Sequence, residues 1–80
     1  MSEEHTYARN AGNILADYTQ AIQLNPSYAK AYANRGITLV RMGDRPGAIA
    51  DLQQAARLFR VQGMAADAQK ALDLIGQLQK

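Results

Sequence analysis

The sequence predicts an all-α protein in which four helices form antiparallel hairpins. Three observations support this fold class: the composition, an internal repeat of 34 residues, and turn signals between segments of helical length. Hydrophobic residues make up 48% of the 80 residues, and aromatic residues only 6%. Much of the hydrophobic fraction is alanine, which with leucine, glutamine and arginine favours helices, whereas β-branched residues are sparse.

The internal repeat is visible when the chain is shifted by 34 residues. Five residues then fall on identical ones: Ala16, Asp17, Gln20, Ala21 and Leu24 on Ala50, Asp51, Gln54, Ala55 and Leu58. A period of this length with helical spacing is the size of one helix–turn–helix unit, so the chain is expected to be an α-solenoid fragment.

Turn residues set the expected helix ends. Asn25-Pro26-Ser27 separates the first helix from the second, because proline lacks the backbone donor and suits a helix start. Gly43 can end the second helix in a left-handed conformation, Asp44 can cap the third and Pro46 fits its first turn. Gly63 is expected to end the third helix. We therefore expect helices near 4–24, 28–42, 45–61 and 65–79.

Apolar residues at helical spacing give each helix a buried side. In the first helix these residues are Tyr7, Ala11, Ile14, Tyr18 and Ile22, and they continue past Gly12, which favours one long helix. In the last helix they are Ala68, Ala71, Leu72, Ile75 and Leu78. We expect the remaining side of the last helix to face solvent: Asp67, Lys70, Asp73, Gln77 and Lys80.

Composition argues against several functions. The net charge of +2 is too small to indicate nucleic acid or an anionic membrane as a partner, and no apolar run has the ~20 residues that span a bilayer. There is no cysteine, and His5 has no second ligand at metal spacing. No nucleophile–base set or phosphate-binding loop is present. We expect no enzyme activity, no metal and no cofactor. Because the N-terminus carries Glu3 and Glu4 in place of basic residues followed by an apolar run, a signal peptide is not indicated, and we expect a cytoplasmic protein.

The stretch from Ala29 to Leu58 resembles a complete tetratricopeptide repeat (TPR). The residues that carry the resemblance are Tyr32, Gly36, Leu39, Ala48, Leu52 and Ala55. Residues 1–80 are then one TPR-like domain, with a partial first repeat at 1–26, a complete repeat at 27–60 and a capping helix at 64–80. Two positions depart from the family pattern: Ile14 stands in place of alanine, and Arg60 in place of proline.

The resemblance implies a non-catalytic module that binds a peptide or helix of a partner protein in a groove. Its expected partner-binding residues follow one side of the second helix: Lys30, Ala33, Asn34, Ile37 and Arg41. Some relatives hold a partner's terminal carboxylate with lysine and asparagine, but only Lys30 and Asn34 fit that pattern here. The alternative reading of this side is an ordinary solvated helix face.

The first helix raises a second hypothesis, because the hairpin partner expected beside it is missing. An uncovered apolar side of a helix usually marks an interface, or a place where a longer repeat array has been divided. The chain could be part of a longer array, or residues 1–10 could fold back as a short helix. It could also self-associate, so that helix one completes the stack of another subunit in a homo-oligomer. The residues expected at such an interface are Leu15, Tyr18 and Ile22.

Overall fold

The computed structural model describes the backbone of residues 3–80 and the side chains of residues 14–80. It contains α1 (Glu3–Leu24), α2 (Ala29–Arg41), α3 (Arg45–Val61) and α4 (Ala65–Leu78). The predicted all-α fold is confirmed, and each predicted helix end lies within one residue of the observed end. The predictions for His5, Tyr7 and Ala11 concern side chains outside the described residues.

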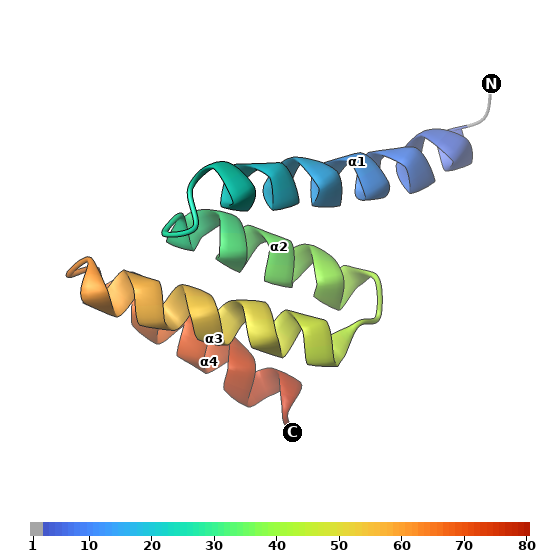
Figure 1. The fold of residues 1–80 in the computed structure, drawn as a ribbon. Coiled ribbons are helices and arrows are strands. Elements are labelled where there is room, and N and C mark those ends of the chain that lie inside the picture. The colour runs from blue at the N-terminus through green and yellow to red at the C-terminus, as the bar shows by residue number, and fades with distance from the viewer. Residues whose placement is uncertain (1–2) are drawn as a thin grey trace.

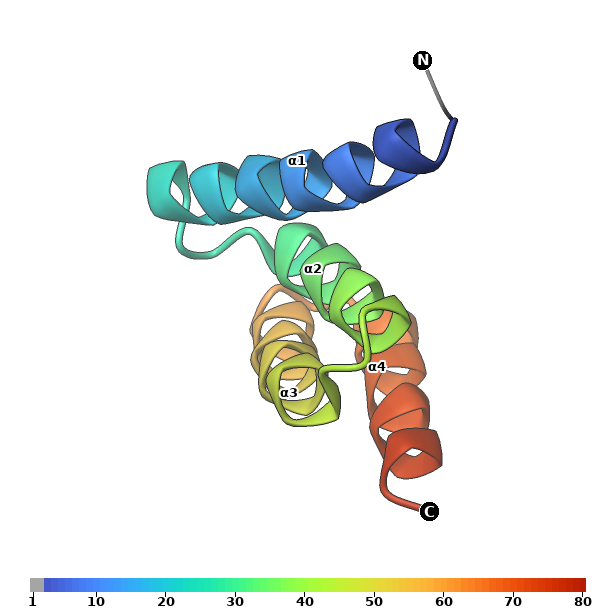
Figure 2. The same ribbon diagram turned by 90° about the vertical axis from the view of Figure 1, so that its right-hand side faces the viewer.

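Consecutive helices pack side by side, α1 against α2, α2 against α3 and α3 against α4 (Figure 1). Figure 2 shows that α1 crosses one end of the stack, while α2, α3 and α4 gather below it. Because Glu3–Leu24 is one continuous helix, the alternative in which the start of the chain folds back as a separate helix is wrong for residues 3–10.

Two glycine turns end α2 and α3 in the same way, as predicted. Gly43 and Gly63 have φ of 86° and 78°, a left-handed conformation that favours glycine. The next residue in each turn donates its amide to a carbonyl of the last helical turn: Asp44 to Leu39 at 2.9 Å, and Met64 to Phe59 at 2.8 Å. These bonds satisfy carbonyl groups that the helix leaves without partners.

The start of α3 also follows the sequence prediction. Asp44 is the N-cap residue, and its Oδ1 accepts a hydrogen bond from the amide of Gly47 at 3.0 Å. Pro46 lies in the first turn, where its missing N–H leaves no helical bond unmade. The turn therefore reverses the chain between α2 and α3 within three residues, 42–44.

The core lies where α3 contacts both α2 and α4. One buried cluster joins Ala29, Ala55, Phe59 and Ala68, and a second joins Leu52, Ala56, Ala71 and Ile75. Alanines dominate both clusters, so the helix backbones can approach closely. Ile14 and Leu72 were predicted to lie in the core, but they are exposed: Ile14 is 41% exposed and Leu72 is 39% exposed.

Gly36 lies at the crossing of α2 and α3, as the repeat pattern predicts. A Cβ atom at this position would lie 3.1 Å from Cγ of Leu52 and 3.2 Å from the carbonyl oxygen of Ala48. The second contact is with backbone, which cannot move without shifting α3. The absent side chain of Gly36 therefore sets how closely these two helices pack.

An ion pair beside this crossing holds three helices together. Nε and Nη2 of Arg35 donate to the two carboxylate oxygens of Asp51 at 2.7 and 2.8 Å, and Nη1 lies 3.4 Å from the hydroxyl of Thr19. The Asp51 side chain is nearly buried, and the guanidinium also lies 5.5 Å from the ring centre of Tyr32. Hydrogen bonding to Asp51 raises the pKa of Arg35. This geometry joins α2 to α3 and reaches α1.

Candidate partner-binding groove

A groove runs between α2 and α4, with α3 as its floor. It consists of three hollows of about 450, 220 and 190 Å³, beginning at the turns that precede α2 and α4. The first and second hollows share Lys30, Phe59 and Asp67. The second and third share Ile37, Leu52 and Leu74, so the three form one continuous feature. We call this feature the α2–α4 groove.

One wall of the groove comes from α2 and contains all five residues singled out in the sequence. Lys30, Ala33, Asn34 and Ile37 line the central hollow, and Arg41 lines the hollow at the far end. Lys30 and Arg41 are exposed, and Ile37 is 37% exposed, so both charged and apolar groups are accessible. Helical spacing positions these side chains together, because residues three or four apart share a side.

The opposite wall comes from α4, and the sequence analysis missed it. Asp67, Lys70 and Leu74 line the central hollow, and Gln77 lines the far one with Leu78. Three of these residues had been expected on a side that faces only solvent. The error follows from placing Leu72 rather than Leu74 on the inner side. The buried residues Ala68, Ala71 and Ile75 fix the orientation of α4 and turn Leu74 towards α2.

The floor of the groove is formed by Leu52 and Phe59 of α3. They are 1% and 7% exposed, and each belongs to one of the two core clusters. Core packing therefore fixes the floor before any partner arrives, which reduces the ordering cost of binding. An apolar floor with a few polar groups on its walls is the usual composition of a binding site.

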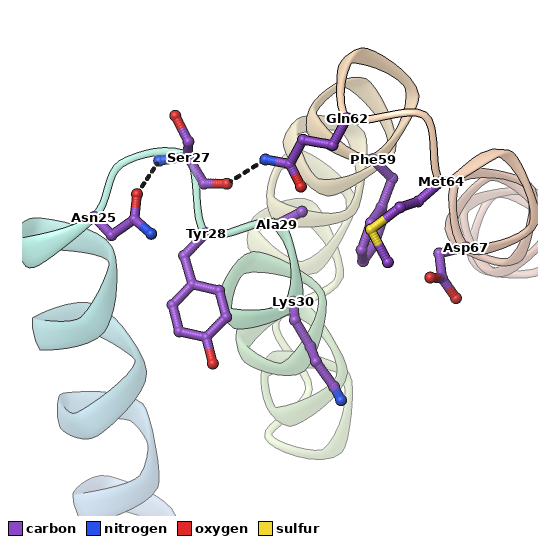
Figure 3. A pocket seen from close by; sticks show the side chains of 9 residues that line it. All are labelled: Asn25, Ser27, Tyr28, Ala29, Lys30, Phe59, Gln62, Met64 and Asp67. Carbon is purple, nitrogen blue, oxygen red and sulfur yellow. Dashed lines mark hydrogen bonds between the residues drawn. The ribbon is translucent and has the colours of Figure 1, made fainter.

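The largest hollow lies at the turns and is shown in Figure 3. Nε2 of Gln62 donates to the carbonyl oxygen of Ser27 at 2.7 Å, which links the end of α3 to the turn before α2. The amide of Ser27 donates to Oδ1 of Asn25 at 3.1 Å, which steadies that turn. Lys30 and Asp67 flank the hollow from α2 and α4, and Met64 lies between them (Figure 3).

The walls carry three cations, Lys30, Arg41 and Lys70, and one carboxylate, Asp67. Within residues 14–80, the only ion pair found joins Arg35 to Asp51. The three groove cations are exposed, so their charges are available to a partner. With these side chains the groove can bind a segment that offers apolar groups and acceptors.

The second set of predicted residues lies on α1. Leu15 and Tyr18 are half-buried, and Ile22 is buried against the rest of the chain, so Ile22 is not available at an external surface. The exposed large apolar residues of the described part of α1 are Ile14 and Leu24, and Leu24 is 80% exposed. Ile14 was expected in the core, and Leu24 was noted only as a repeat position.

Within residues 3–80, none of the helices combines the length and apolar character required to cross a bilayer. Each helix packs against its neighbour in the chain, and the sequence repeats with the length of one helical hairpin. This combination is typical of a helical-repeat protein. Residues 15–43 match a family model described as "TPR repeat". This match supports a tetratricopeptide-repeat protein, as the resemblance indicated, and covers the part of the chain that holds α2. No curated protein and no solved structure matches the chain.

The matched segment runs from the middle of α1 through α2 to Gly43. It includes all five predicted α2 residues of the groove, so the α2 wall lies wholly within the match. Tetratricopeptide repeats generally mediate protein–protein interactions and generally serve as non-catalytic scaffolds.

Proposed function

We propose that this protein is a non-catalytic interaction module whose α2–α4 groove binds a segment of a partner protein. The observation that supports the proposal best is the continuous groove. It has an apolar floor, and one wall contains the five α2 residues that the sequence singles out. A partner that covers this floor removes apolar surface from water, while the walls offer groups for orientation. A cytoplasmic location is consistent with this role and stays a prediction.

The experiment is a capture of proteins from cell extract on the immobilised chain, with matched variants. Lys30→Ala/Asn34→Ala removes two polar groups of the α2 wall at exposed or half-buried positions. We expect this variant to lose the captured partner while its thermal unfolding midpoint is nearly unchanged, because neither residue belongs to the core clusters.

The matched control is Arg57→Ala/Gln53→Ala, which alters two exposed residues of α3 that line none of the three hollows. This control is expected to capture the same partner as the unchanged chain. If both double variants retain the partner equally, the groove is not the binding surface.

A second candidate function is self-association through α1. The exposure of Ile14 and Leu24 favours it, because apolar groups left in water are stabilised by burial against another chain. Among the main helix contacts of the described chain, α1 packs against α2 alone, so much of its surface is free. In this reading, α1 of one subunit completes the stack of another.

A further inference from the structure

The two walls of the groove carry more cations than carboxylates. Lys30 projects from α2 and Lys70 from α4, and both line the central hollow. Arg41 adds a third cation at the far end, whereas Asp67 is the only carboxylate on the walls. Since these cations take part in no ion pair within residues 14–80, an anionic group placed between them would gain attraction from both sides.

Apolar residues dominate the far part of the groove. Ile37 and Val40 of α2 face Leu74 and Leu78 of α4 across Leu52, around the hollow of about 190 Å³. Ile37 and Val40 are exposed, so a partner side chain can reach them. The groove therefore has an apolar lining at its centre and its far end, with two cations at the centre and one at the far end, and a suitable occupant must carry both acidic and apolar groups.

Resting on the proposed function, we infer that the α2–α4 groove selects an acidic, leucine-bearing protein segment. Internal aspartate or glutamate side chains lie between Lys30 and Lys70, and aliphatic side chains lie against Ile37, Val40 and Leu74. Asp67 repels the acidic groups and so directs them towards Lys70 rather than towards the turns. A nucleic acid is a poorer occupant, because a sugar–phosphate backbone has no apolar groups for the Leu52 floor.

The probe is a labelled peptide of 13 residues, the length of α2, built of leucine, alanine and glutamate with both ends blocked. Blocked ends ensure that the anionic groups are side chains. Two further peptides carry glutamine or lysine in place of glutamate. We expect the full chain to bind the glutamate peptide roughly three- to tenfold more tightly than the glutamine peptide, as two exposed ion pairs would give. The lysine peptide should bind most weakly, and added salt should reduce these differences.

Charge reversal provides the matched test. Lys30→Glu/Lys70→Glu should invert the order of the three peptide affinities, so that the lysine peptide binds most tightly. Arg57→Glu/Arg60→Glu changes the net charge equally on exposed residues of α3 that line none of the hollows, and should leave the order unchanged. If the order of the peptide affinities changes equally in both variants, the preference is a general charge effect and the inference is overturned.

A third variant, Leu74→Glu, separates this inference from the proposed function. If glutamate and glutamine peptides bind equally well and Leu74→Glu abolishes both, the groove binds partners but does not select acidic ones, and only the inference fails. If no peptide binds, or if binding survives Leu74→Glu, the groove is not a peptide site and both proposals fail. Circular dichroism of each variant verifies that it remains helical.

Discussion

At the scale of single residues, two glycines in helices have opposite environments. An added Cβ at Gly36 would meet Leu52 and the carbonyl of Ala48 at 3.1 and 3.2 Å, whereas at Gly76 nothing lies within 4 Å. Alanine stabilises a helix interior by about 0.5–1 kcal/mol relative to glycine. Gly76→Ala should therefore raise the unfolding free energy by up to that amount.

Gly36→Ala should instead lower the unfolding free energy, because overpacking costs about 1–3 kcal/mol and exceeds the same helical gain. Urea unfolding followed by circular dichroism measures both variants. Equal stabilisation by the two substitutions would show that α2 and α3 do not pack closely at Gly36.

At the scale of elements, the Arg35–Asp51 pair fixes α2 to α3. Asp51→Ala would remove both carboxylate acceptors of the Arg35 guanidinium, whose side chain is 24% exposed, and would leave only the hydroxyl of Thr19 at 3.4 Å. We expect a loss of about 2–3 kcal/mol, the upper range for hydrogen bonds to charged groups. The double variant Arg35→Met/Asp51→Leu should recover part of this loss, since apolar replacement of a buried pair is often neutral. A double-mutant cycle with the single variants Arg35→Met and Asp51→Leu measures the coupling by thermal unfolding, and strictly additive losses would contradict it.

At the scale of the whole molecule, the proposed self-association through α1 can be tested by the mass of the protein in solution. If self-association occurs, Leu15→Glu or Tyr18→Glu should lower both the solution mass and the unfolding midpoint, because a half-buried surface receives a charge. Ile14→Glu, at a more exposed position, should lower the mass with a smaller effect on the monomer. Light scattering across a range of concentrations measures the mass. A constant monomer mass for the unchanged chain would exclude this function.

The helices could be predicted from the sequence because their ends depend on local chemistry. Gly43, Asp44 and Gly63 act within their own turns, so no knowledge of tertiary contacts is needed. Gly36 was also identified in advance, because its position within the 34-residue period indicates a helix crossing. The α2 wall of the groove could likewise be named, since all five residues share one side of one helix.

The orientation of α4 could not be predicted in the same way. Leu72 and Leu74 fit an apolar stripe almost equally well, and only packing against α3 decides which of them turns inwards. Because of this error in the orientation of α4, Lys70 and Asp67 were predicted to face solvent, whereas they line the groove. Ile14 was misplaced for a related reason, since the apolar stripe of α1 does not show which of its residues another helix covers.

The alanines at the centre of the molecule have a consequence for recognition. Ala55 is fully buried and belongs to one core cluster with Ala29 of α2 and Ala68 of α4, the two helices that form the walls of the groove. A bulkier side chain at Ala55 would push the walls apart and change how well a ligand fits without touching it. The specificity of such a protein can thus be altered from its interior, by residues that no binding partner ever meets.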